Sequence, residues 1–336
     1  MTDASPPSPN WTPGAWFDAG DGHRVWWCDG GDPAGRPVLI LHGGPGGASR
    51  IETTRWFDGL PVRWIVFDQR GCGRSTPAGA TRANDLAALA ADALGLRERL
   101  GIARWGLVGG SWGARVALAC ATADPARFSG LYLRSPFLGS PAESQRYVAH
   151  WHIWLGDAGR QWLGPSRAQA FFELFHPGAI AGPGYGESIG DDEPLARAWS
   201  AYDDAQSPAG GVAASGARFD AARLPKASAE LIASWRVHAH YAASGWGTSR
   251  EVWQLDAVAP RALEQAGPVS IVWGEADGTC DPAVAATLAR QWPSAHTAAV
   301  PGAGHRMGDP RLQPVLAAEA RRWALSLGAA PTGAAP

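Results

Sequence analysis

Short, continuously apolar segments recur along this chain of 336 residues, separated by longer segments with helical character. A strand that is buried on both faces of a sheet has no polar side, so its sequence is apolar throughout. Alternation of such strands with helices is typical of a mostly parallel sheet covered by helices. The segments expected to be strands are residues 38–41, 64–67, 105–108, 131–133, 271–273 and 297–300. The sequence therefore predicts an α/β fold.

Other segments complete this prediction. Asp21-Gly22 separates apolar stretches at Trp16-Phe17 and at residues 24–27, which is a strong β-hairpin signal. Asn84-Asp85 can cap a helix, rich in Ala and Leu, that reaches Leu100.

From about Ser140 onward the strand pattern disappears, and a Trp-rich stretch reads as a helical insertion. We therefore expect a helical lid at residues 140–265, inserted into a core made of residues 14–139 and 266–327. Residues 1–13 and 328–336 are rich in Pro, Ser, Gly and Ala and are expected to be flexible tails.

Charge and composition exclude several functional classes. The net charge of −2 offers no electrostatic attraction to nucleic acid or to an anionic membrane. No run of about 18 apolar residues is present to span a bilayer, and residues 1–13 have no apolar segment of a signal peptide. The cysteines are scattered without a CxxC pair, which favours reduced thiols in a cytoplasmic protein; they are Cys28, Cys72, Cys120 and Cys280.

The most specific local feature is residues 109–113, Gly-Gly-Ser-Trp-Gly, between the strand at 105–108 and a predicted helix from Trp112 to Ala123. A Gly-x-Ser-x-Gly pentad between a strand and a helix is the nucleophile elbow of the α/β-hydrolase fold. Its small residues let strand and helix approach closely, which predicts Ser111 as the nucleophile, with its hydroxyl at the C-terminal edge of the sheet. The alternative is a glycine-rich turn with an idle serine.

A serine nucleophile needs a histidine base and an orienting carboxylate, which follow it in this fold in the order acid, then histidine. Asp277 follows the strand at 271–273, and His305 follows the last predicted strand. Both then fall at the sheet edge that carries Ser111, so we predict a triad. The rivals are Glu275 and Asp281 for the acid, while His296 falls at the opposite edge.

Acyl transfer also requires two backbone N–H donors aimed at the oxyanion. The loop at residues 42–46, His-Gly-Gly-Pro-Gly, predicts the N–H of Gly44 as one donor. The second is the N–H of Trp112, directly after the nucleophile. The glycines can equally serve a tight loop that needs positive φ angles, and both interpretations can hold together.

Taken together, these motifs closely resemble those of proline iminopeptidases, also called prolyl aminopeptidases. The resemblance covers about residues 14–137 and 266–312, and it implies the α/β-hydrolase fold, a helical lid, small peptide substrates, no metal and no organic cofactor. The motifs that carry it are HGGPGG at 42–47, DQRGCGRST at 68–76, GGSWG at 109–113 and the segments around Asp277 and His305.

The resemblance further implies that lid carboxylates bind the substrate's free amine beside an aromatic pocket for proline. The family's first lid motif reads roughly Trp-Ser-x-Trp-Glu. Residues 199–204 read Trp-Ser-Ala-Tyr-Asp-Asp, so Asp203 stands for the Glu, beside Tyr202 and Asp204. The second motif has a Glu shortly before a His-Tyr pair, and His238 occupies that place. Either Asp203, Asp204 or another lid acid binds the amine, or the substrate has no free amine.

The leading hypothesis is a serine aminopeptidase that releases N-terminal proline, or another small residue, from short peptides. The first alternative is a hydrolase with an altered lid that acts on small esters, amides or lactones without a free amine. The second is a hydrolase-like protein that binds without catalysis. The sequence leaves the oligomeric state open.

Overall fold

The computed structural model describes residues 13–175, 192–206, 218–246 and 267–328. An eight-stranded sheet has the order β1-β2-β4-β3-β5-β6-β7-β8. The β1–β2 and β2–β4 pairs are antiparallel, and the remaining neighbours are parallel. The strands are β1 (Ala15–Gly20), β2 (His23–Gly31), β3 (Arg36–Leu41), β4 (Val62–Phe67), β5 (Trp105–Gly110), β6 (Phe128–Arg134), β7 (Val269–Gly274) and β8 (His296–Val300).

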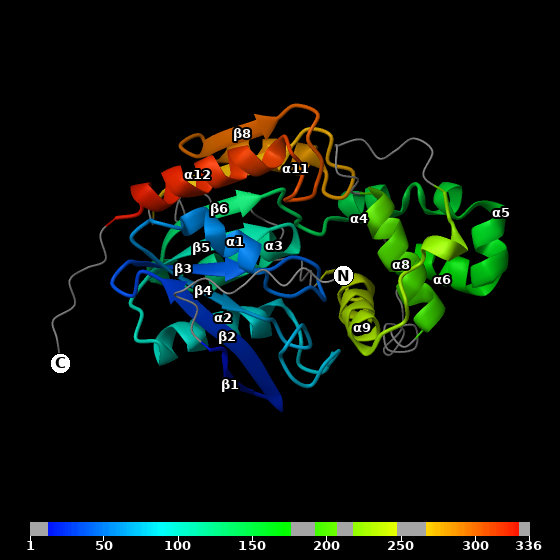
Figure 1. Cartoon of the computed structure of the whole chain (residues 1–336), viewed down its shortest axis with the longest axis horizontal. Coiled ribbons are helices and arrows are strands. Elements are labelled where there is room, and N and C mark those ends of the chain that lie inside the picture. Colours follow the sequence, from blue (N-terminus) through cyan, green and yellow to red (C-terminus); the bar gives the residue numbers. More distant parts are fainter. Residues whose placement is uncertain (1–12, 176–191, 207–217, 247–266, 329–336) are drawn as a thin grey trace.

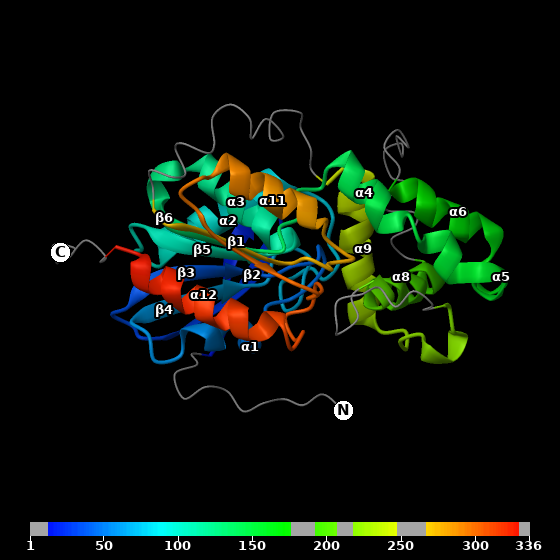
Figure 2. The same ribbon diagram turned by 90° about the horizontal axis from the view of Figure 1, so that it is seen from above.

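The central strands are buried on both faces, which explains their apolar sequences. In β3, Leu39 and Leu41 join one hydrophobic cluster, and Val38 and Ile40 join the other. Helices α2, α3 and α11 cover the first face and α1 and α12 cover the second (Figure 2). Their bounds are α1 (Ile51–Thr54), α2 (Leu86–Arg99), α3 (Trp112–Ala123), α11 (Pro282–Gln291) and α12 (Leu312–Ser326). The predicted α/β fold is confirmed.

Between β6 and β7 the described chain is helical. These helices lie beyond the edge toward which the parallel strands point (Figure 1). They are α4 (Pro141–Val148), α5 (Trp151–Leu163), α6 (Pro165–Leu174), α8 (Glu193–Gln206) and α9 (Ala229–Ala243).

The predicted lid boundaries at 140 and 265 stay predictions. Residues 176–191, 207–217 and 247–266 lie outside the described residues. So do residues 1–12 and 329–336, which carry nearly all of the two predicted tails.

Among the helices of the predicted lid, α9 lies next to the core, and polar contacts hold it there. Tyr241 donates its hydroxyl to Asn84 Oδ1 at 2.8 Å, and His240 Nε2 donates to the Asn84 carbonyl at 2.8 Å. A Cβ on Gly46 would lie 2.2 Å from the carbonyl oxygen of Ser234 on the same helix. The loop that follows β3 therefore contacts α9 so closely that only glycine fits.

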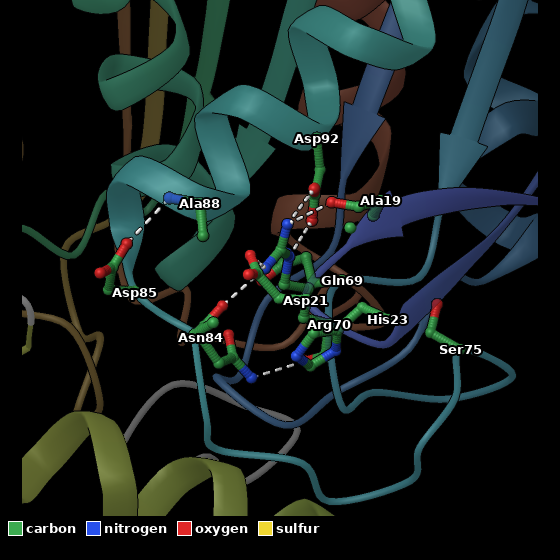
Figure 3. A network of polar contacts seen from close by, with 12 residues as sticks. Ala19, Asp21, His23, Gln69, Arg70, Ser75, Asn84, Asp85, Ala88 and Asp92 are labelled. Carbon is green, nitrogen blue, oxygen red and sulfur yellow. Dashed lines mark hydrogen bonds and ion pairs between the residues drawn. The ribbon is translucent and has the colours of Figure 1, made fainter.

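A buried ion pair organises the loop after β4 (Figure 3). Arg70 donates to both carboxylate oxygens of Asp92, from Nε at 2.7 Å and from Nη2 at 2.8 Å. It also donates to the carbonyls of Ala19 and Ala83. The guanidinium thereby joins the β1–β2 hairpin, the loop after β4 and helix α2.

We expect Asp92→Ala to lower the free energy of unfolding by about 3 kcal/mol or more, because it leaves the Arg70 charge buried without its carboxylate. Urea unfolding monitored by circular dichroism measures this loss. The control is Asp157→Ala, since the Arg160–Asp157 pair is exposed. A surface pair of this kind contributes little, so the control should unfold like the wild type. Equal curves for the two variants would contradict a structural role for the buried pair.

Candidate active site

Ser111 lies on a tight turn between β5 and α3, with φ 57° and ψ −126°. This region is strained for a residue other than glycine, and such strain tends to occur at functional sites. A Cβ on Gly109 would lie 2.3 Å from the Gly113 carbonyl oxygen, and a Cβ on Gly113 would lie 2.3 Å from the Leu41 carbonyl oxygen. Both positions need glycine because strand, helix and the neighbouring β3 meet here.

Asp277 and His305 come together across the loops after β7 and β8. His305 Nδ1 donates to Asp277 Oδ2 at 2.8 Å, which leaves Nε2 as a bare acceptor. The other carboxylate oxygen accepts the backbone N–H groups of Thr279 and Cys280 at 2.9 and 2.8 Å. Burial alone would raise the pKa of Asp277, but His305, the Cys280 N–H and the Ser135 side chain outweigh it, so the pKa is lowered. The carboxylate is charged and holds the imidazole in one tautomer.

The rival residues lie elsewhere. Glu275 is exposed, and Asp281 Oδ1 caps α11 by accepting the Ala283 N–H. His296 begins β8, at the opposite edge of the sheet, and pairs with Glu319. The structure thus brings Asp277 and His305 together and leaves the three rivals apart.

Cys280 is a neighbour that the sequence reasoning missed. Within the described residues, the Ser111 hydroxyl lies 3.5 Å from Cys280 Sγ and is not hydrogen-bonded to His305. Burial raises the pKa of the Cys280 thiol well above its usual range, so the group stays protonated. Catalytic hydrogen bonds are often loose before substrate binds. Cys280 follows Asp277 by three residues in the same loop, and this spacing could have indicated that it lies near the site.

Two arginines hold the backbone around these residues. The Ser111 N–H donates to the Arg134 carbonyl at 2.9 Å, and Arg134 Nη1 donates to the His305 carbonyl at 2.6 Å. Arg146 Nη2 donates to the Asp277 carbonyl at 2.9 Å. Arg134, buried at the end of β6, therefore links the turn at Ser111 to the loop that carries His305. No local sequence pattern predicts this contact.

The loop after β3 is clamped by the loop after β4. His42 Nε2 accepts the Gln69 N–H at 3.0 Å, while Gln69 Nε2 donates to the His42 carbonyl at 2.9 Å. Trp112 Nε1 donates to Gln69 Oε1 at 2.9 Å. Burial lowers the pKa of His42, which keeps it neutral and able to accept. This clamp orders the glycine-rich loop.

The same loop runs beside the serine. A Cβ on Gly43 would lie 3.5 Å from Ser111 Cβ. On the other side, the Trp112 N–H belongs to the first turn of α3, where backbone N–H groups have no acceptor within the helix and favour an anion. Of the predicted oxyanion donors, Trp112 directly follows Ser111 and Gly44 borders the same cavity as Ser111, and their role stays a prediction.

A cavity of about 770 Å³ lies between this edge of the core and the lid. It is lined by core residues that include Gly43, Gly44, Pro45, Ser111, Arg134 and His305, and by lid residues Trp199, Asp203, Asp204, Ser234 and His238. Most of the residues singled out in the sequence therefore border one space.

The lid carboxylates differ in setting. Asp203, on α8, is partly buried and accepts the Tyr147 hydroxyl at 3.1 Å. Burial raises its pKa, and the nearby His305 opposes that rise. Asp204 is exposed and forms an ion pair with Arg306. Asp203 is the better placed anion for a charged ligand inside the cavity.

Tyr202 does not line the cavity, contrary to its inclusion among the expected substrate contacts. It is fully buried in the lid, donates its hydroxyl to the Tyr147 carbonyl and accepts from Gln206 Nε2 at 3.1 Å. We therefore exclude it from the proposed substrate contacts. Its place on α8, one residue before Asp203, turns it toward the lid core.

His238 lines the cavity from α9 and is only 5% exposed. Burial lowers its pKa to about 3, so the imidazole is neutral. A hydrogen bond to the backbone of Pro45 opposes this shift. Aromatic rings surround it, with the Trp199 and Trp246 ring centroids 4.7 and 5.4 Å away.

Two further findings concern metal binding and membrane-spanning helices. Within the described ranges, no three His, Cys, Asp or Glu side chains are grouped so that they could hold a metal ion. No helix in these parts of the chain combines the length and apolarity needed to span a bilayer.

Comparison with known sequences adds independent information. A family described as alpha/beta hydrolase fold matches residues 36–308. A proline iminopeptidase of Neisseria meningitidis serogroup A is 31% identical over 312 residues, covering 88% of this chain and 90% of the relative. That of Xylella fastidiosa strain Temecula1 is 33% identical over 299 residues, covering 87% and 90%.

Solved structures with similar folds are more distant in sequence. A proline iminopeptidase-related protein from Thermus thermophilus aligns with a TM-score of 0.57 and 22% identity, covering 95% of this chain and 99% of that one. An esterase from Rhodococcus aligns with a TM-score of 0.58 and 17% identity, covering 95% and 100%. At these identities the likeness shows the shared fold alone.

Proposed function

Because the chain belongs to the proline iminopeptidases of the α/β-hydrolase fold, we propose that it is a serine aminopeptidase releasing N-terminal proline, or another small residue, from short peptides. The observation that carries the proposal is that Asp203 borders the same cavity as Ser111 and His305. An anion for the substrate's amine and a nucleophile for its first carbonyl thus share one cavity.

In the proposed mechanism, His305 Nε2 takes the proton of the Ser111 hydroxyl as the oxygen attacks the carbonyl of the N-terminal residue. The N–H groups of Gly44 and Trp112 stabilise the oxyanion. His305 then gives its proton to the leaving amine as the peptide bond breaks, which leaves an acyl-serine. Water, deprotonated by His305, attacks the ester and releases the amino acid.

The decisive comparison uses prolyl-arylamide, its N-acetyl derivative and a simple aryl ester. We expect turnover of the free-amine arylamide and little turnover of its N-acetyl form, since acetylation removes the charge that Asp203 binds. Hydrolysis of the ester or the blocked amide alone would refute the aminopeptidase proposal and leave a serine hydrolase of another specificity.

Asp203→Asn should lower kcat/KM for prolyl-arylamide by about 100-fold, because the substrate ammonium then enters the cavity without its anionic partner. Hydrolysis of an uncharged aryl ester should change little. Steady-state kinetics on both substrates measures the difference. Asp204→Asn is the matched control and should have the smaller effect, because that carboxylate is exposed and paired with Arg306. A larger loss in the control would assign the amine to Asp204.

His238 favours a second candidate, a hydrolase of small esters, amides or lactones without a free amine. A neutral imidazole offers no charge to an ammonium, and it stands where the family has a carboxylate. The aryl ester and N-acetyl arms of the same comparison test this candidate. Fluorophosphonate labelling tests the remaining one, a protein that binds without catalysis, which would leave Ser111 unlabelled.

A further inference from the structure

We propose that Arg50 binds the free carboxylate of the residue that leaves during catalysis, so that dipeptides with an N-terminal proline are the preferred substrates. This inference rests on the proposed aminopeptidase function and adds a substrate class to it. The proposed function requires an anion for the amine and a nucleophile for the carbonyl, and it leaves open what binds the peptide beyond the scissile bond.

The proposed mechanism determines which part of the cavity receives the leaving residue. His305 Nε2 gives its proton to the leaving amine, so that amine lies beside the imidazole. Residues 306–308, which follow His305 directly, also border the cavity. The N-terminal residue extends the other way, because Asp203 of the lid binds its amine. The leaving residue therefore lies on the core side of the cavity, next to residues 306–308.

The segment around α1 forms another wall on this side of the cavity. Arg50, directly before the helix, and Trp56, shortly after it, both border the cavity. Trp56 and Met307 are partly buried and pack against the hydrophobic cluster on the second face of the sheet, so they offer a fixed apolar surface to the leaving residue. A cavity of about 770 Å³ accommodates a drug-sized ligand, and therefore also a dipeptide.

Arg50 differs from the other guanidinium groups at the cavity in its partners. Arg306 forms an ion pair with Asp204, and Arg134 is buried and donates to the His305 carbonyl. The Arg50 side chain is exposed and forms no ion pair with any residue that the structure describes. A guanidinium presents paired N–H groups that match the two oxygens of a carboxylate. The terminal carboxylate of a dipeptide would supply this missing partner.

The backbone that carries Arg50 is held in place by the residue before it. Ser49 donates its N–H to Asp68 Oδ1 at 2.7 Å and its hydroxyl to the Phe67 carbonyl at 2.9 Å. Its own carbonyl accepts from Arg74 Nη2 at 3.1 Å. Binding therefore has to order the Arg50 side chain but not its loop, which limits the entropy lost on association.

The test compares kcat/KM for prolyl-leucine with that for prolyl-leucine amide, which lacks only the terminal charge. Leucine is chosen as the second residue because Trp56 and Met307 offer it an apolar surface. We expect the wild type to favour the dipeptide about fivefold, the gain from one partly exposed ion pair. Raising the ionic strength should lower this ratio, because dissolved ions screen such a pair.

Variants then assign the preference to single charges. Arg50→Met should bring the ratio of the two kcat/KM values toward one, and Arg50→Lys, which keeps the charge but loses the planar fork, should retain part of the preference. Glu52 borders the same part of the cavity and repels a carboxylate, so Glu52→Gln should raise the ratio. Arg55→Met is the matched control, because Arg55 is exposed but does not border the cavity, and it should leave the ratio unchanged.

A wild-type ratio at or below one would overturn the inference, while turnover of the two prolyl substrates would still uphold the proposed function. The same ratio in the wild type and in Arg50→Met would overturn it as well. An equal fall in Arg50→Met and Arg55→Met would attribute the preference to total charge and not to a subsite. Absence of turnover for every free-amine prolyl substrate, with ester hydrolysis retained, would remove the proposed function and this inference with it.

Discussion

Replacing Ser111 by alanine is expected to lower kcat for prolyl-arylamide by about 10⁵-fold or more, the usual consequence of deleting a serine nucleophile. The reason is that the acyl-enzyme route disappears and only binding and the oxyanion donors remain. Single-turnover kinetics at high enzyme concentration measures the residual rate. Fluorophosphonate labelling followed by peptide mapping should locate the label on Ser111 in the wild type and nowhere in the variant.

Cys280→Ala is the control for this experiment, because the thiol lies 3.5 Å from the hydroxyl and is a nucleophile by type. A thiol that remains protonated is a poor nucleophile, so this variant should retain most of the activity and the label. If the label and the activity followed Cys280 instead, the chain would be a cysteine hydrolase, and the proposed mechanism would be wrong.

Asp277→Asn should lower kcat by about 10⁴-fold with a much smaller change in KM. An amide in place of the carboxylate no longer stabilises the imidazolium and can present its NH₂ group to His305 Nδ1, which favours the tautomer that cannot take the Ser111 proton. Steady-state kinetics measures this split between kcat and KM. Asp281→Asn is the control, since that carboxylate, four residues after Asp277, caps α11 instead of contacting His305.

The same carboxylate also contributes to stability with a defined sign. The pKa of Asp277 is lowered in the folded chain, so its ionisation stabilises the fold above its ordinary value of about 4. This contribution is lost as the pH falls through the folded pKa. Unfolding curves of the wild type and Asp277→Asn should therefore converge at acid pH. A difference that is unchanged between pH 7 and pH 3 would contradict this assignment.

Local patterns were sufficient for the sheet and for the contact between Asp277 and His305, while the catalytic role of the triad stays a prediction. Each central strand can be predicted from its sequence, because burial on both faces excludes polar residues from it. The turn at Ser111 can also be predicted from its sequence, because the close approach of strand and helix excludes a Cβ at Gly109 and Gly113. Asp277 and His305 could be placed because parallel strands bring the residues that follow them to one edge, whatever their distance in sequence.

Other parts of the site depend on packing that no local pattern encodes. Arg134 reaches His305 from a different strand, and Cys280 reaches Ser111 from the loop of the acid. Tyr202 was expected at the substrate because a motif places it beside Asp203, yet adjacent helical residues point about 100° apart. One therefore faces the lid core while the next borders the cavity.

By itself, the sequence determined the fold, because strand burial and the sterics of the Ser111 turn restrict which residues can stand at those positions, and its motifs indicated the family. The triad stays a prediction. Only the tertiary structure decided what meets across the cavity. Asp203, His238 and Trp199 border the cavity that holds Ser111. Their roles depend on how α8 and α9 pack beyond the edge of the sheet, since contacts between residues far apart in the sequence follow no local pattern.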